Sequence, residues 1–344
     1  MLKQSIFFIS ALLMGSLCFT SCSDDDDDYL GNWVEYGDFS GKVRSDAVSF
    51  TIGDDVYVGT GYDYDDDEKF NDFWKLRISG TPETQISIQW TQIEDLPGVA
   101  RNRAVAFATD TKGYVGTGSD EDDAKLKDFY EYDPATGWTQ KSDFKGTARR
   151  GATAFCLDNI GYVGTGEDDD ENKSDFFSYN PSTDTWTAIS NVPKKRRFAM
   201  SFVLDGKAYL LSGFDNGTSH DDFYEYDVAN NAWVAKRRIS DYTDSGYDDD
   251  YDYDIQRYSA VVFTMDGKAY LATGSQGGLT NQTWEWDPMT DTWDQKTDFE
   301  GAARSGAIAF TVNNVGWVAT GGNGSYSFDD MWYFEPDEEY ENKD

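Results

Sequence analysis

The sequence predicts an all-β protein, a β-propeller of six blades with four strands in each blade. Three observations predict this fold. The composition combines 16% aromatic residues with 32 glycines and only 7 prolines, as expected for many short strands joined by glycine-containing turns. One pattern with a period of about 50 residues recurs along the chain. The N-terminal segment contains one strand that the last repeat lacks.

Each of the six repeats begins with an arginine that is followed, six residues later, by a phenylalanine. The arginines are Arg44, Arg101, Arg149, Arg196, Arg257 and Arg304, and the phenylalanines are Phe50, Phe107, Phe155, Phe202, Phe263 and Phe310. Successive arginines are 57, 48, 47, 61 and 47 residues apart. The small apolar run between arginine and phenylalanine predicts the first, innermost strand of each blade.

Three more strands follow in each repeat. The second begins with Tyr or Trp and ends in a small-residue doublet, as in residues 114–118, and the third is aromatic, as in residues 128–133. The fourth contains a tryptophan, which is Trp90, Trp138, Trp186, Trp233 or Trp293. From about Tyr29 to the C-terminus this order resembles kelch-repeat propellers, such as the galactose-oxidase-like central domain. The resemblance implies the fold and says little about function.

The two ends of the chain complement each other. The sixth repeat stops after its third strand, residues 331–334, whereas Trp33 near the N-terminus has no repeat of its own. Trp33 precedes Phe39 by the same number of residues as Trp138 precedes Phe144. We therefore predict that the first strand completes the last blade and closes the ring, which leaves no exposed inner edge.

Residues 1–21 are expected to be a signal peptide and not part of the fold. Lys3 is followed by an apolar run, residues 6–17, that is too short to span a bilayer. The segment before Cys22 resembles a bacterial lipoprotein signal, which implies that the Cys22 thiol carries a lipid. The alternative is an ordinary secretory signal with another cleavage site. We assign residues 29–344 to the propeller.

Residues 22–28 are interpreted as the lipidated cysteine and an acidic tether. The run Asp24 to Asp28 resembles the surface-export signal of Bacteroidetes lipoproteins, and its alternative is a solvated spacer. The resemblance implies a lipid-anchored protein of the outer membrane, exposed on the cell surface. The only expected contact with the membrane is through the lipid.

The charge of the chain restricts its partners. With 64 acidic and 29 basic residues, the formal net charge is −35. Such a chain repels nucleic acid and anionic lipid surfaces. We therefore expect no nucleic-acid partner, a monomeric chain, and a protein or glycan partner at the loop face.

The six repeated arginines are the first candidate ligand site. Guanidinium groups around a channel mouth suit a carboxylate or a sulfate. The alternative is structural, because an aspartate recurs before the third strand of five repeats. These residues are Asp72, Asp128, Asp175, Asp222 and Asp330, with Gln282 at the same place in the fifth repeat. We favour ion pairs that pin neighbouring blades, and Arg257 is then the candidate for an unpaired arginine.

The loops between the second and third strands of the first three repeats are acidic. As speculative metal ligands we name Asp63, Asp65, Asp67, Asp120, Asp122, Asp168 and Asp170. Calcium takes six to eight oxygen ligands, and aspartate-rich loops supply them. No segment has the spacing of an EF-hand loop. Calcium is therefore a possible cofactor without an assigned site.

An insertion after the fourth repeat explains the spacing of 61 residues. Its core consists of Tyr247, Asp248, Asp249, Asp250, Tyr251, Asp252, Tyr253 and Asp254. Tyrosine supplies rigid contact area and aspartate supplies charge specificity, so we predict a loop that contacts a protein or a glycan. The alternative is a solvated acidic loop.

The sequence gives little support for catalysis, and we assign no catalytic residue. Copper chemistry of the galactose oxidase type needs two histidines, whereas the chain has only His220, an apparent surface residue, and one cysteine after Cys22, Cys156. The expected function is a surface-tethered binding module. Two alternatives remain. One is a sugar-modifying enzyme similar to the sialic acid mutarotases, by analogy of fold. The other is a structural lipoprotein stabilised by calcium.

Overall fold

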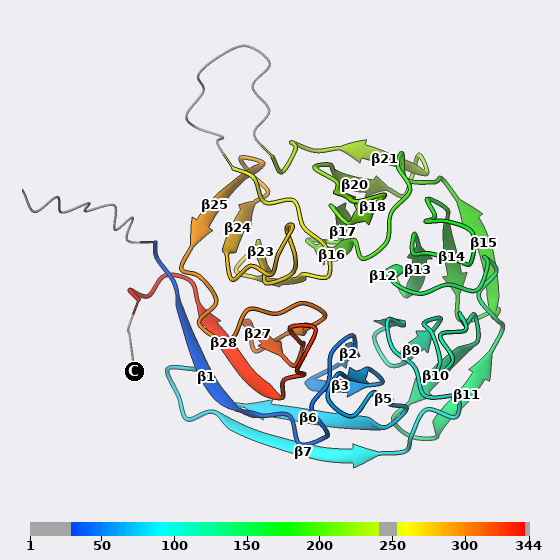
Figure 1. The fold of residues 1–344 in the computed structure, drawn as a ribbon, viewed down its shortest axis with the longest axis horizontal. Coiled ribbons are helices and arrows are strands. Elements are labelled where there is room, and N and C mark those ends of the chain that lie inside the picture. The colour runs from blue at the N-terminus through cyan, green and yellow to red at the C-terminus, as the bar shows by residue number, and fades with distance from the viewer. Residues whose placement is uncertain (1–28, 241–252, 341–344) are drawn as a thin grey trace, which may run out of the picture.

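The computed structural model describes residues 29–240 and 253–340. The predicted signal peptide, Cys22, the acidic tether and residues 241–252 of the insertion lie outside this range. Figure 1 shows six small sheets arranged as a closed ring around a central axis. Each sheet has four antiparallel strands. In the described residues no helix is long and apolar enough to cross a membrane.

Five blades are continuous in sequence. Blade 1 contains β2 (Val48–Ile52), β3 (Asp55–Gly59), β6 (Phe73–Ser79) and β7 (Ser87–Ile93), and blade 2 contains β8 (Val105–Ala108), β9 (Gly113–Gly116), β10 (Phe129–Asp133) and β11 (Gly137–Lys141). Blade 3 contains β12 (Thr153–Leu157), β13 (Ile160–Gly164), β14 (Phe176–Asn180) and β15 (Thr185–Ile189). Blade 4 contains β16 (Met200–Leu204), β17 (Lys207–Leu211), β20 (Phe223–Asp227) and β21 (Ala232–Ala235), and blade 5 contains β22 (Val261–Met265), β23 (Lys268–Ala272), β24 (Thr283–Asp287) and β25 (Thr292–Lys296).

Two short hairpins decorate the loops between second and third strands. They are β4 (Tyr62–Asp63) with β5 (Glu68–Lys69) in blade 1, and β18 (Phe214–Asp215) with β19 (Thr218–Ser219) in blade 4. These loops and the connections between blades lie on one side of the ring, as the antiparallel strand order requires. We call this side the loop face.

The sixth blade joins both ends of the chain. It contains β26 (Ile308–Val312), β27 (Val315–Ala319), β28 (Asp330–Glu335) and, as its outermost strand, β1 (Asn32–Asp38). Trp33 pairs with Phe334, is buried, and packs edge-on against Phe299 with ring centres 5.0 Å apart. The predicted closure of the ring by the N-terminal strand is confirmed, and Figure 1 shows β1 alongside β28.

The core lies between adjacent blades. The repeated phenylalanine stacks on the tyrosine of the second strand, as Phe107 does on Tyr114 with ring centres 4.9 Å apart. The same phenylalanine also reaches the next blade, where Gly161 leaves room for its ring and a Cβ atom would collide with it. The phenylalanine ring of one blade therefore packs directly against the backbone of the next blade, and only glycine leaves room for this close approach.

Two closed rings of backbone hydrogen bonds surround the axis. In the inner ring each amide donates to a carbonyl of a neighbouring blade over 2.8–3.2 Å, and all six residues have positive φ. These residues are Asp46, Arg103, Gly151, Phe198, Ser259 and Gly306. In the outer ring the glycine of each small-residue doublet donates to the carbonyl of the next repeated arginine, as Gly118 does to Arg149 over 2.8 Å. Main-chain hydrogen bonds thus join every neighbouring pair of blades around the axis.

Candidate functional site

The six repeated arginines are structural. Arg149 is fully buried, and its Nη1 donates to the Thr165 carbonyl at 2.9 Å and to Asp175 Oδ1 at 2.6 Å, while Nη2 donates to Asp175 Oδ2 at 2.9 Å. The same two-pronged pairing joins Arg44 to Asp72, Arg101 to Asp128, Arg196 to Asp222 and Arg304 to Asp330. Each pair lies within one blade, so the expectation that these ion pairs pin neighbouring blades is wrong. The backbone carbonyl of each arginine makes the link between blades.

Arg257 differs from the other five because its blade has Gln282 in place of aspartate. Its guanidinium is nevertheless fully buried and donates to the carbonyl oxygens of Ile255, Thr273 and Gln282 and to Gln282 Oε1. Burial lowers the pKa of Arg257 to about 10, although the charge of Asp298 opposes this shift. The expectation that Arg257 is unpaired and available to a ligand is therefore wrong.

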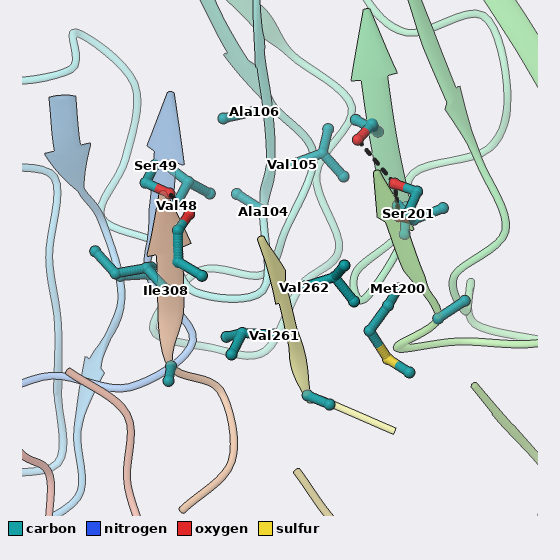
Figure 2. Close-up of a pocket in the computed structure, with 18 residues that line it drawn as sticks. Val48, Ser49, Ala104, Val105, Ala106, Met200, Ser201, Val261, Val262 and Ile308 are labelled. Carbon is teal, nitrogen blue, oxygen red and sulfur yellow. Dashed lines mark hydrogen bonds between the residues drawn. The ribbon is translucent and has the colours of Figure 1, made fainter. Parts of the chain in front are cut away.

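A narrow channel of about 220 Å³ runs along the axis. Its wall comes from the innermost strands, and every blade contributes an alanine, namely Ala47, Ala104, Ala152, Ala199, Ala260 and Ala307. Figure 2 shows the small side chains of this wall, including Val48, Ser49 and Ser201. In the described structure this lining contains no charged residue.

Three other arginines gather on the loop face where this channel opens. Arg103, Arg150 and Arg197 come from blades 2, 3 and 4 and follow the repeated arginines by one or two residues. Their side chains are 29%, 21% and 30% exposed. Arg103 Nε lies 2.9 Å from Asp46, Arg150 Nε lies 2.6 Å from Glu167, and Arg197 also pairs with Glu167. We call these three residues the mouth arginines.

The mouth arginines repel one another. Burial and the charge of Arg103 lower the pKa of Arg150, and burial with the charges of Arg150 and Arg103 lowers the pKa of Arg197. The pKa of Arg103 is raised, chiefly by the charge of Asp46. In the described structure the buried Nε of Arg197 has no hydrogen-bond partner. An added anion would relieve this repulsion and supply an acceptor.

Aromatic rings contact two of the three mouth arginines. The guanidinium carbons of Arg103 and Arg197 each lie 5.3 Å from the ring centre of Phe198, within the range of cation–π contacts. Arg197 also lies 5.5 Å from the ring centre of Phe214, which packs 4.7 Å from Tyr258. A stacked guanidinium keeps its in-plane N–H groups available, and these groups suit the flat oxygen pair of a carboxylate.

The acidic loops are largely bonded within themselves. Asp63, Asp120 and Asp168 each accept the backbone N–H of the residue two positions later, at 3.0, 3.1 and 3.0 Å. Those later residues are Asp65, Asp122 and Asp170, and Asp67 accepts a hydrogen bond from the Tyr62 hydroxyl at 2.6 Å. Within the described residues no three acidic, histidine or cysteine side chains are placed to hold a metal ion.

Lysines cross-link these loops from blade to blade. Lys69 of blade 1 pairs with Asp123 of blade 2 at 2.9 Å, and Lys125 of blade 2 pairs with Asp169 of blade 3 at 2.9 Å. Lys195 of blade 4 pairs with a glutamate of the blade 3 loop. The acidic loops thus form a partly neutralised rim around the mouth arginines.

Only two of the insertion residues lie in the described structure. Tyr253 is buried against Trp284, with ring centres 6.0 Å apart, so its ring is part of the core and not of a contact surface. Asp254 is exposed, and its carbonyl oxygen accepts a hydrogen bond from Gln276 Nε2 at 2.7 Å. The remaining predicted contact residues, 247–252, lie outside the described residues.

Neither Cys156 nor His220 is arranged for catalysis. Cys156 is half-buried, and burial raises its pKa to about 11, so the thiol stays protonated at neutral pH. His220 is half-buried, not exposed as the sequence indicated, and its Nε2 lies 2.8 Å from the carbonyl oxygen of Lys195. Burial lowers the pKa of His220, which favours the neutral ring with Nε2 as the donor.

Comparison with known proteins agrees with this geometry. The profile of the KLHDC2/KLHL20/DRC7 Kelch-repeats domain matches residues 46–244, more than half of the chain. The chain belongs to this kelch-repeat family. Among solved structures it is similar to YjhT, with a TM-score of 0.66 and 16% sequence identity over 85% of this chain and 95% of that one. This likeness shows the fold alone. A search of curated proteins finds no significant match.

The mouth arginines were missed because they do not recur. The position directly after the repeated arginine holds Ser45, Asn102, Arg150, Arg197, Tyr258 or Ser305, and the next one holds the residues of the inner backbone ring. A search for the periodic pattern therefore passes over both positions. The signal that could have revealed them is a departure from the repeat. Charged residues occur in some repeats only, one or two residues after an arginine that is present in every repeat.

Proposed function

We propose that this protein is a lipid-anchored binding module of the cell surface that receives an anionic group of a protein or glycan partner at the mouth arginines. The observation that supports the proposal is the cluster of Arg103, Arg150 and Arg197, three partly exposed guanidiniums that repel one another where the channel opens. A carboxylate or sulfate would accept charge-assisted hydrogen bonds from them.

The charge of the rest of the chain makes this site selective. A net charge of −35 repels strongly anionic partners at long range, whereas the mouth arginines attract a single anionic group at short range. The fitting partner therefore carries an isolated carboxylate or sulfate on a neutral or basic body. A polyanion such as nucleic acid is disfavoured by the acidic rim.

Binding of defined anionic probes tests the proposal. Full-length protein in detergent would be applied to arrays of uronic-acid glycans, sulfated glycans and peptides with free C-terminal carboxylates. We expect retention on at least one class and its loss in the triple variant R103Q/R150Q/R197Q. The matched control is R77Q, because Arg77 is an exposed arginine paired with Asp55 on the opposite face. Equal retention of the triple variant, or none by the native protein, would contradict the proposal.

The membrane address has its own test. In cells grown with a labelled fatty acid, the native chain should acquire the label and fractionate with the outer membrane. Changing Cys22 to Ser should abolish the label and release the protein from the membrane, because acyl chains supply the anchoring energy. Membrane association of the unlabelled C22S variant would refute the anchor but not the anion site.

A sugar-modifying enzyme of the sialic acid mutarotase type is the second candidate. The observation that favours it is Glu167, a carboxylate that lies between Arg150 and Arg197 at the channel mouth. Exchange of anomers of sialic acid and common sugars, followed by NMR, would test it with E167Q as the comparison. Unchanged exchange rates with the native protein would remove this candidate.

A further inference from the structure

A second hollow lies on the loop face, between blades 4 and 5. It has a volume of about 450 Å³. One wall is the β18–β19 hairpin with Phe214 and Ser219, and the opposite wall is the loop after β23 with Gln276. Tyr258 and Gln256, from the connection into blade 5, form its inner side. Phe214 separates this hollow from the mouth arginines, because its other side faces Arg197.

The corresponding space between blades 1 and 2 is closed. There the Lys69 side chain is buried and crosses to blade 2, where its ammonium group reaches the carbonyl of Asp120 and the carboxylate of Asp123. The hollow between blades 4 and 5 instead has glycines at its rim. At Gly217 and Gly277 an added Cβ would meet no atom within 4 Å, so no described neighbour packs against the rim at these two positions.

The side chains that line the hollow suit a neutral ligand with a hydroxylated ring, such as a sugar. Phe214 and Tyr258 present aromatic surface, and Thr218 and Ser219 add hydroxyl groups. The side-chain carbonyl oxygen of Gln256 is buried and has no hydrogen-bond partner in the described structure. A buried acceptor without a partner is costly, and a ligand hydroxyl would satisfy it once the Gln256 side chain turns its oxygen toward the hollow.

The charge of the wall excludes an anionic ligand. In the described residues Asp254 is the only charged residue that lines the hollow, and Arg197 lies on the other side of Phe214. An anion would face this carboxylate without a compensating cation. The volume lies within the range of small-molecule sites, about 300–1,000 Å³.

We infer that this hollow is a subsite for a neutral monosaccharide unit, with Gln256 Oε1 as an acceptor for a sugar hydroxyl and Tyr258 as its apolar wall. The inference rests on the proposed function and makes it more specific. The partner would be a glycan that contacts both the hollow and the mouth arginines. A neutral sugar would occupy the hollow and an anionic group would bind the mouth arginines.

Saturation-transfer NMR and calorimetric titration of the full-length protein in detergent test the inference. The probes are glucose, galactose, mannose and N-acetylglucosamine, each also as a neutral disaccharide. We expect at least one to bind at millimolar concentration. Gln256→Leu should weaken this binding about tenfold, because it removes the acceptor and keeps the bulk of the side chain. The melting temperature of Q256L should equal or exceed the native value, since an unsatisfied buried group is removed.

Two further variants separate this inference from the anion site. Tyr258→Ser removes the aromatic wall and should also weaken sugar binding, whereas R103Q should leave the neutral sugars unaffected. In the converse measurement, Q256L should retain anionic probes that the triple arginine variant loses. Sugar binding that is equal in native protein and Q256L, or no binding of any neutral probe, would overturn the inference while leaving the anion site standing.

Discussion

Arg149 and Arg150 are adjacent in sequence, yet they belong to different parts of the molecule. Arg149 is fully buried inside blade 3, where Asp175 and the Thr165 carbonyl accept hydrogen bonds from its guanidinium. Arg150 lies at the channel mouth beside Glu167 and repels Arg103. Arg196 and Arg197 divide in the same way in blade 4. The arginine that occurs in every blade is buried and stabilises its own blade, whereas the arginines that occur in only three blades stay partly exposed at the channel mouth.

The largest expected effect comes from a substitution of the buried arginine, Arg149. Arg149→Met leaves the Asp175 carboxylate without its cation, and breaking a buried ion pair costs about 3–5 kcal/mol of unfolding free energy. Arg150→Met, one residue away, should cost less, because Glu167 keeps its ion pair with Arg197. Urea denaturation monitored by tryptophan fluorescence would measure both. Equal losses would show that the two arginines do not differ in role.

The repeats made the framework predictable. The number of blades, the strand order and the closing role of Trp33 all follow from features that recur in the sequence. They recur because the side chains of every blade pack against its neighbours in the same way. Spacing alone did not reveal that Arg149 and Asp175 share a blade. It also did not show which tyrosine of the insertion is buried, since only the contact of Tyr253 with Trp284 decides this. The mouth arginines could not be predicted from the repeat, because they occur in only some of the repeats and therefore give no periodic signal.

The second prediction concerns β1, the strand that closes the ring. Trp33→Ala should cost about 3 kcal/mol, the lower part of the range for a buried tryptophan, and should loosen the joint between β1 and β28. The matched variant is Trp138→Ala in β11, the outer strand of a blade that is continuous in sequence. Because Trp138 is only half-buried, its loss should be smaller. Thermal melts of both variants would rank them, and a greater loss in W138A would argue against β1 as the critical joint.

Acid should weaken the framework ion pairs. Burial alone would raise the pKa of Asp222, but the hydrogen bonds and charge of Arg196 outweigh it and hold the pKa below its ordinary value. The resulting stabilisation is therefore full above the unfolded pKa of about 4 and is lost as the pH falls through the native pKa. Asp222→Asn should lower the free energy of unfolding at neutral pH and flatten the acid side of the stability profile. Parallel profiles of variant and native protein would contradict this assignment.

The smallest expected effect sharpens the comparison within the framework. Gln282→Asp would give Arg257 the carboxylate partner that the other five arginines have, and Trp284 would keep an acceptor for its indole N–H. We expect a gain of about 1 kcal/mol, the difference between a neutral and a charge-assisted hydrogen bond. The reverse exchange, Asp330→Gln in blade 6, should lose a similar amount. A destabilised Q282D would mean that blade 5 has adapted its surroundings to a neutral partner.

The inner ring of backbone hydrogen bonds has a consequence for how such a protein diversifies. Its six residues are Asp46, Arg103, Gly151, Phe198, Ser259 and Gly306, and their amides and carbonyls alone close the ring. Gly151 and Gly306 have no side chain, and an added Cβ would collide there with a neighbouring blade, whereas the side chains of the other four do not supply the hydrogen bonds of this ring. A mutation at one of these four points can therefore change the surface at the channel mouth while the axis stays intact, provided that the new residue tolerates positive φ. Selection is thus able to rewrite the recognition surface one blade at a time, and descendants with unrelated ligands can keep the same hub.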